Sequence, residues 1–386
     1  MAQGTGTPGV TVAVTSGNLQ RPVPVLDGIA GIMGTAYTVA NIGVVKTVYG
    51  YDDAVEKGYT PELEPFLNKQ LREFYNELGG TQEVWVLGVE DTMLLKDMVS
   101  TTNANGLKKL LAVSRGRVNM PYICRKPDAT YTPPVAFLDK DVSDAVTASK
   151  ALCQYQQKIN QPIRLLIEGR VVDVDQANTF MPATASNTYV GVVLGGSLAD
   201  GSASGSVALA RAIKYGAHVK IGNGQNGALT ITPVFIGDRP LEEFFPEELD
   251  NLSDAGYIIF HHRDGAAGYY FGIDKMAGND DFEILAYGRM MDKVQRIATA
   301  TSMPFVETSV RMNPDGTIND ADAQYLEDLI KTAILAGTEA QLSAVDVIIP
   351  TAQNIINTST LSIQVKIQPL GYLTWINITM GLTTNL

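Results

Sequence analysis

The two ends of this sequence contain almost no charged side chains, and this limits what they can do in a folded protein. Charged residues make up 18% of the 386-residue chain, yet only four lie in residues 1–45 and 340–386 together. These four are Arg21, Asp27, Asp346 and Lys366. Exposed edge strands normally carry charges that stop other chains from pairing with them. Uncharged ends are therefore either buried in their own domain or paired with a neighbouring copy of the chain.

Apolar residues alternate along both ends, which is typical of β-strands. Extended arms of this kind are suited to strand addition between subunits. The alternative is that they are ordinary strands packed within their own domain. The residues that we predict to take part in strand exchange between subunits are Val10, Val12, Val14, Leu361, Ile363, Val365, Ile367, Tyr372, Ile376 and Ile378.

The composition excludes several classes of function. The formal net charge is −12, which argues against nucleic-acid binding because phosphate neutralisation needs a clustered basic surface. No uncharged apolar stretch of about 18 residues predicts a membrane span, so we expect no direct membrane insertion. The chain has two cysteines, Cys124 and Cys153, which argues against a disulfide framework and fits synthesis in a reducing cytoplasm.

From residue 28 to residue 238, short apolar runs alternate with helical patterns. This alternation predicts an α/β layer fold with a mostly parallel sheet. The expected strands are 29–34, 84–89, 122–124, 163–167 and 189–194, and the expected helices are 61–78, 93–113, 142–159 and 207–215. The helix at 93–113 is expected to be split or capped near Asn105 and Gly106.

The pattern changes after Pro240, where we place a domain boundary. Strands are expected at 257–261 and 269–273, around a turn at residues 263–265. Two helices with apolar stripes follow, and Asp280 or Asp281 is a candidate N-cap of the first. Their stripes cover residues 282–297 and 326–334, and a strand is expected at 345–349. The sequence therefore predicts a second domain, of the α+β class, that the N-terminal arm joins.

Three motifs have a chemical interpretation, and each has a simpler one. Residues 222–227 match the pattern GxGxxG, but a β-like segment with a proline follows where a dinucleotide site needs a helix. The pair Asp173 and Asp175 lacks a third metal ligand, so a solvated turn is the better interpretation. His261 and His262 are adjacent and would point to opposite faces of a strand. We predict no catalytic, cofactor-binding or metal-ligating residue.

In its order of elements, most of the chain resembles the sheath proteins of contractile phage tails and related injection systems. The resemblance begins with the opening strand at 7–12 and the glycine-rich segment at 28–36. It continues with the Ser/Gly-rich entry to a short helix at 204–212. The strongest part extends from 255 to 274 and into the helix at 282–301.

This resemblance implies a structural subunit of stacked hexameric rings around an inner tail tube protein, linked by strand exchange between terminal arms. Baseplate and terminator proteins would bind the ends of the polymer, and contraction would drive the tube through a target envelope. The implied location is a virion tail or injection particle assembled in the bacterial cytoplasm. The implied divisions are a 1–27 N-terminal arm, a 28–238 outer domain, a 239–360 inner domain and a 361–386 C-terminal arm.

The contact with the tube would use cations on the last two helices. The candidates are Arg289, Lys293, Arg296 and Lys331, and a solvated helix face is the alternative use of such charges. A nucleotide-binding α/β enzyme is the alternative function, supported by the alternating elements and the glycine-rich segment at 222–227.

Overall fold

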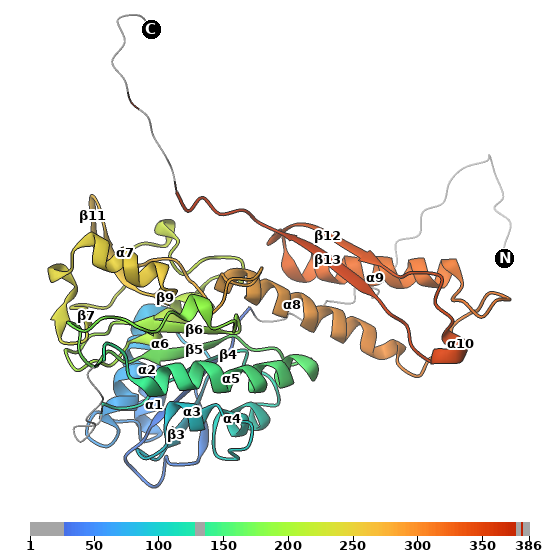
Figure 1. Cartoon of the computed structure of the whole chain (residues 1–386). Coiled ribbons are helices and arrows are strands. Elements are labelled where there is room, and N and C mark those ends of the chain that lie inside the picture. Colours follow the sequence, from blue (N-terminus) through green and yellow to red (C-terminus); the bar gives the residue numbers. More distant parts are fainter. Residues whose placement is uncertain (1–26, 128–135, 376–379, 381–386) are drawn as a thin grey trace, which may run out of the picture.

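The computed structural model describes residues 27–127, 136–375 and 380, which form two units (Figure 1). The large unit, residues 27–284, is a layered α/β body. The C-terminal unit, residues 285–369, is an elongated assembly of two long helices and a β-hairpin beside it. We call residues 370–375, which follow the hairpin, the tail.

A seven-stranded sheet forms the centre of the large unit, in the order β2-β3-β1-β4-β5-β6-β9. Strand β2 is antiparallel to its neighbour β3, and the other pairs are parallel. Its inner strands are near-continuous apolar runs because helices cover both faces. The strands are β1 (Ala30–Thr35), β2 (Val45–Val48), β3 (Val84–Val89), β4 (Met120–Ile123), β5 (Leu165–Gly169), β6 (Val190–Leu194) and β9 (Tyr257–Ile258).

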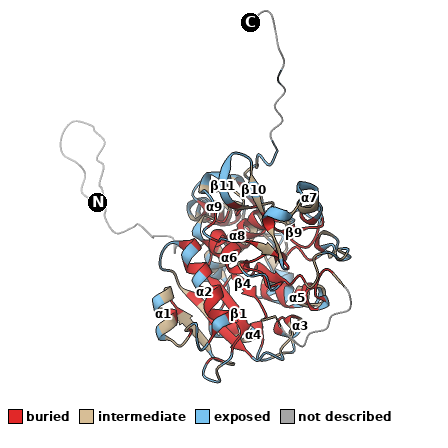
Figure 2. Ribbon diagram, turned by 90° about the vertical axis from the view of Figure 1, so that its left-hand side faces the viewer, coloured by how far each residue is buried: buried red, intermediate tan, exposed pale blue. Residues whose placement is uncertain are grey.

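Two groups of helices enclose this sheet. Helix α2 packs against α6 and both contact β1, whereas α3 packs against α5, and α5 contacts β5 and β6. Figure 2 shows the buried strands between these helices. The helices are α1 (Tyr51–Glu56), α2 (Pro65–Leu78), α3 (Leu95–Met98), α4 (Leu107–Val113), α5 (Lys140–Lys158), α6 (Gly205–Lys214) and α7 (Pro246–Asp254). The predicted mixed α/β fold with a mostly parallel sheet is confirmed.

The C-terminal unit has its own small cores. Helices α8 (Leu285–Ser302) and α9 (Asp320–Thr338) pack together, and α9 packs on β12 (Leu342–Ile348), which pairs with β13 (Gln364–Pro369). The short helix α10 (Ile355–Thr358) lies in the connection between the two strands. One core contains Val294, Ile297, Ile330, Ile334, Val345 and Val347, and the other contains Ile318, Ala323, Leu326 and Ile349.

Short elements complete the large unit and the end of α8. Strands β10 and β11 form a hairpin around the turn that the sequence predicts at residues 263–265. The short strands are β7 (Phe235–Ile236), β8 (Arg239–Pro240), β10 (Phe260–Arg263) and β11 (Ala266–Phe271). The 3₁₀ helices are η1 (Pro182–Thr184), η2 (Gly224–Asn226), η3 (Leu241–Glu243) and η4 (Met303–Phe305).

Two details differ from the expectations. Helix α8 begins after Ile284, not after Asp280 or Asp281, because the Asp280 carboxylate accepts hydrogen bonds from the Phe282 amide and the Thr188 hydroxyl. The main hydrophobic core extends from Ile29 to Leu285, and so it crosses the boundary that we place near Pro240.

Candidate assembly surfaces

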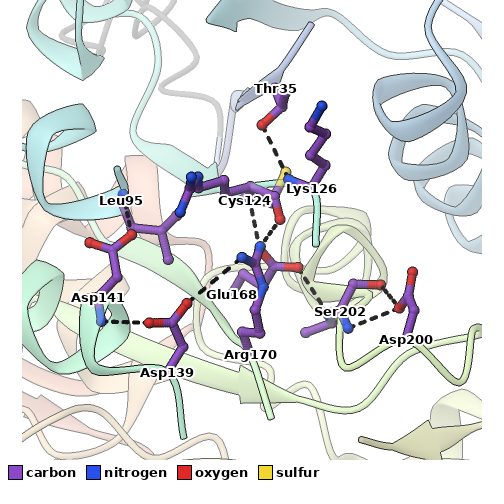
Figure 3. A network of polar contacts seen from close by, with 12 residues as sticks. Thr35, Leu95, Cys124, Lys126, Asp139, Asp141, Glu168, Arg170, Asp200 and Ser202 are labelled. Carbon is purple, nitrogen blue, oxygen red and sulfur yellow. Dashed lines mark hydrogen bonds and ion pairs between the residues drawn. The ribbon is translucent and has the colours of Figure 1, made fainter. Parts of the chain in front are cut away.

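The carboxyl ends of β1 and β4 mark the place where an open α/β sheet usually binds a ligand. In this protein the place is filled by a network of polar side chains (Figure 3). Glu168, at the end of β5, is completely buried. Its carboxylate accepts hydrogen bonds from the Arg125 amide at 2.7 Å and the Ala203 amide at 3.1 Å, and from the Arg170 guanidinium at 3.1 Å. Burial raises the pKa of Glu168 despite these donors.

The loop before α6 also packs against the carboxyl end of β4. The Tyr122 hydroxyl donates to the Ala203 carbonyl at 3.0 Å and accepts from the Gly205 amide at 3.3 Å. Ala203 and Ser204 are fully buried. The crevice in which a nucleotide would bind is therefore occupied by the protein itself.

The structure agrees with the simpler interpretations of the glycine-rich segment and of the Asp173 and Asp175 pair. Residues 224–226 form a single turn of 3₁₀ helix, capped by Asn223, so the glycine-rich segment does not begin a longer helix. The Asp173 carboxylate accepts from the Asp175 amide at 3.0 Å, which confirms a turn. In the described ranges, no three His, Cys, Asp or Glu side chains are grouped so that they could hold a metal ion. None of the helices in those ranges is both long and apolar enough to cross a bilayer.

Part of the predicted C-terminal arm pairs within its own unit. Strands β12 and β13 are antiparallel, with Val345 opposite Ile367 and Val347 opposite Val365. Their apolar side chains face α8 and α9, and Ile363 and Leu361 also pack on the small cores. For residues 361–369 of this arm, the structure therefore agrees with the alternative, in which the strands pack within their own domain.

The hairpin nevertheless keeps two strand edges available. In the described part of the chain, β12 and β13 pair only with each other, so each strand has one edge without a backbone partner. Unpaired edges of this kind are templates for the addition of another strand. Exchange by Leu361, Ile363, Val365 and Ile367 stays a prediction, in which Val365 and Ile367 would present the edge of β13.

The tail leaves the hairpin and contacts the large unit at one residue. The Tyr372 hydroxyl donates to the carbonyl of His218 at 2.6 Å, and its ring lies 5.3 Å from the ring of Tyr287. Beyond this contact, Leu373 is 88% exposed and Trp375 is 77% exposed. An extended segment with large apolar side chains in solvent is a candidate for burial by another chain. The predicted exchange residues Val10, Val12, Val14, Ile376 and Ile378 lie outside the described residues.

One face of α8 attaches the C-terminal unit to the large unit through charged side chains. We call this contact, made by Arg289, Asp292, Lys293 and Arg296 with their partners, the α8 joint. Arg164 donates from Nε and Nη2 to the two oxygens of Asp292, each at 2.8 Å. Both side chains are buried, with 2% and 5% exposure.

The three candidate tube cations of α8 belong to this joint. Arg289 donates to the carbonyls of Asp27 and Tyr215 at 3.2 and 3.4 Å, and Lys293 pairs with the Asp27 carboxylate. Arg296 donates to two carbonyls in the loops before β4 and β5, at 2.9 and 2.8 Å. Because Arg289 and Lys293 are buried, the alternative of a solvated helix face is wrong for them.

A tube contact by these side chains would require the joint to open, and it stays a prediction. The fourth candidate, Lys331 on α9, is accessible. Its side chain is 43% exposed, and its ammonium group lies 3.9 Å from Asp346. The three α8 candidates therefore contact the large unit, whereas Lys331 on α9 is accessible to solvent.

Comparison with solved structures places this architecture among contractile assemblies. The helical sheath of the anti-feeding prophage in its contracted state is 14% identical, with a TM-score of 0.63 over 99% of this chain and 100% of that chain. A chain of the six-fold symmetrised baseplate of the same particle is 13% identical, with a TM-score of 0.62 over 98% and 100%. The contracted PVC sheath of an extracellular contractile injection system is 12% identical, with a TM-score of 0.61 over 99% of each chain.

The sequence itself matches two family models that cover most of the chain. Residues 7–274 match the DUF2586 N-terminal domain, and residues 281–386 match the DUF2586 C-terminal domain. A search of the curated proteins gave no significant match. The chain therefore belongs to the DUF2586 family, and it has the fold of contractile sheath proteins.

Proposed function

We propose that this protein is the structural subunit of a contractile sheath and does not act as an enzyme. The observation that carries the proposal is the match of nearly the whole chain to sheath and baseplate chains of contractile particles, each of which it covers to 99% or more. The subunits would polymerise as stacked hexameric rings around an inner tube. The six-fold symmetry of the related baseplate supports this number. The assembly would belong to a phage tail or an injection particle formed in the cytoplasm, and its contraction would drive the tube through a target envelope.

The proposed link between subunits is the addition of strands to the hairpin of a neighbour. The tail of one copy, or its N-terminal arm, would pair with the unpaired edge of β12 or β13 in the next copy. About five backbone hydrogen bonds, at roughly 1 kcal/mol net each, would give on the order of 5 kcal/mol for each contact. Contacts that run head to tail do not close in pairs, so they generate rings and helices.

The proposed contraction is a rigid-body movement of subunits that leaves these strand contacts paired. The α8 joint would let the large unit of each subunit adjust relative to its strand-paired C-terminal unit, because the main core and the C-terminal cores are separate clusters that meet through charged groups. Polar interfaces between units are those that more often rearrange. The baseplate and a terminator would bind the two ends of the polymer, and Lys331 is the accessible candidate for the tube contact.

Electron microscopy of a shortened protein tests the proposal. A variant that ends at Pro369 keeps β13 in its own hairpin and removes the tail, whereas deletion of 361–386 would also expose the small cores. We expect the full chain to form long hollow polymers and the shortened chain to remain as isolated, folded subunits, with a melting temperature lowered only by the loss of the Tyr372 contact. The matched point variant, Trp375→Ser, should weaken polymerisation without altering the fold.

Two results would contradict different parts of the proposal. A shortened chain that polymerises like the full chain would remove the tail from the mechanism but leave the sheath. A full chain that never polymerises, even with a tube protein present, would count against the sheath itself.

A further inference from the structure

The tail is attached to its own large unit at a single residue. In the described part of the chain, no backbone group of residues 371–375 makes a hydrogen bond, and their one side-chain hydrogen bond joins Tyr372 to His218. Residues 373–375 are exposed, and no atom lies within 4 Å of the position that a Cβ would take at Gly371. The tail therefore lies on the subunit without being packed into it.

A groove beside the tail shows the same loose packing. The groove has a volume of about 1100 Å³, and residues 370–375 line it together with α7 and the β10–β11 hairpin. A segment packed along the large unit would fill such a space with its side chains, because protein interiors are closely packed. Instead, the side chains of Leu373 and Trp375 remain largely in solvent. The position of the tail therefore depends on Tyr372.

Tyr372 lies where the two units of the subunit meet. Its hydroxyl donates to the His218 carbonyl at 2.6 Å, and the ammonium group of Lys220 lies 5.4 Å from the centre of its ring. The ring of Tyr287, in the first turn of α8, lies 5.3 Å from the ring of Tyr372. Burial raises the pKa of Tyr372, so the hydroxyl keeps the proton that it donates.

These contacts are weak enough to be reversible. One hydrogen bond changes an equilibrium constant by about two- to tenfold, and a cation over an aromatic ring at a partly exposed site by about two- to fivefold. Strand addition to the hairpin of a neighbour would give the same tail about five backbone hydrogen bonds. The contacts of Tyr372 can therefore delay strand addition but cannot prevent it.

We propose that Tyr372 is a latch that holds the tail on its own subunit and delays its addition to another copy. The latch is closed in the free subunit and opens when the tail pairs with the hairpin of a neighbour. It raises the concentration at which subunits assemble, because its contacts stabilise only the free subunit. This inference rests on the strand addition between copies proposed above.

The protein concentration at which polymers first form tests the latch. Tyr372→Phe removes only the hydroxyl and should lower this concentration by about two- to tenfold. Tyr287→Leu removes the facing ring, leaves the tail unaltered and should also lower it. The matched control is Tyr270→Phe, which should have no effect because the Tyr270 hydroxyl donates to a carbonyl of its own strand. Sedimentation of polymers from a series of protein concentrations measures all four proteins.

The direction of the change separates a latch from a residue of the exchanged strand. If Tyr372 stabilised the contact between copies, its loss would raise the concentration needed for assembly. An unchanged or raised value in Tyr372→Phe would therefore overturn the proposal, as would a raised value in Tyr287→Leu.

A distance measurement in the free subunit tests the closed latch without assembly. Spin labels are attached at Thr374→Cys in the tail and Asp250→Cys on α7, two exposed positions that line the groove. The natural cysteines, Cys124 and Cys153, are buried and stay unlabelled. We expect a narrow distribution of distances between the labels, which becomes broad when Tyr372→Ser is added.

Two results of this measurement would overturn the latch: a broad distribution before Tyr372 is changed, or a narrow one that Tyr372→Ser retains. The measurement does not depend on the sheath. If the full chain never polymerised, the proposed function would fail, and the distances would still decide whether Tyr372 holds the tail on its own subunit.

Discussion

Replacing Asp292 with alanine should destabilise the protein more than any substitution at an exposed ion pair. The change leaves the Arg164 guanidinium without the two hydrogen bonds, each of 2.8 Å, that Asp292 accepts. Arg164 is 2% exposed, and its other contacts are the Thr188 carbonyl and two aromatic rings. Removal of one partner of a buried pair typically costs about 3–5 kcal/mol, because the remaining charge stays buried without compensation.

Chemical denaturation of Asp292→Ala, of a double variant with an apolar pair and of a surface control measures this cost. Asp292→Ala should lower the free energy of unfolding by about 3–5 kcal/mol. The double variant Arg164→Met with Asp292→Leu should recover most of the loss, because an apolar pair of similar volume is often neutral. The control is Asp144→Ala, which removes the exposed Lys140 pair on α5 and should cost at most about 0.5 kcal/mol. If Asp292→Ala cost no more than this control, the joint would not be the buried contact described above.

Two further substitutions test the packing of the joint and the buried network of the sheet. Gly288→Ala would place a methyl group 2.7 Å from the Arg164 guanidinium carbon and should lower the free energy of unfolding by about 1–3 kcal/mol. The control Gly80→Ala, with no atom within 4 Å of the new methyl group, should lower it far less. Equal melting temperatures of the two variants would contradict this. Burial raises the pKa of Glu168 above its ordinary value of 4.5, so the folded protein holds this proton more tightly than the unfolded chain. The stability that this proton contributes is complete below pH 4.5 and is lost as the pH rises through the folded pKa. Chemical denaturation at several pH values measures this effect. As the pH rises, the free energy of unfolding should decline less steeply in Glu168→Gln than in the unaltered protein. Parallel curves for the two proteins would show that the pKa of Glu168 is not raised.

The strands and helices of the central layers could be predicted from the sequence, because a strand buried on both faces of a sheet appears as an uninterrupted apolar run. The run 84–89 is uninterrupted and apolar, and it forms β3 with the expected bounds. The expected helix at 93–113 was divided near Gly106, and the structure has α3 and α4 on either side. Gly79, at φ +69°, ends α2 where the pattern of apolar residues also ends.

The charged contacts could not be predicted in the same way. Arg289, Lys293 and Arg296 have the spacing of a solvated helix face, and only the tertiary structure shows that this face meets the large unit. A signal was present in Arg164, a cation directly before the apolar run of β5, but its partner is 128 residues away along the chain. The sequence also does not determine which strand the C-terminal strand pairs with. The alternation of apolar residues in β13 is the same whether its partner is β12 or a strand of another copy.

The contact of Tyr372 with His218 has a mechanical consequence for the C-terminal unit. In the described residues, this unit is held to the rest of the molecule in two regions: the α8 joint, beside which Gln341 also donates to the Asp27 carboxylate, and the tail. A body held at two points can turn freely only about the line that joins them. Any larger rotation of the hairpin must first release the tyrosine. A large rotation of the C-terminal unit is therefore coupled to the release of the Tyr372 hydroxyl from His218 and of its ring from Lys220.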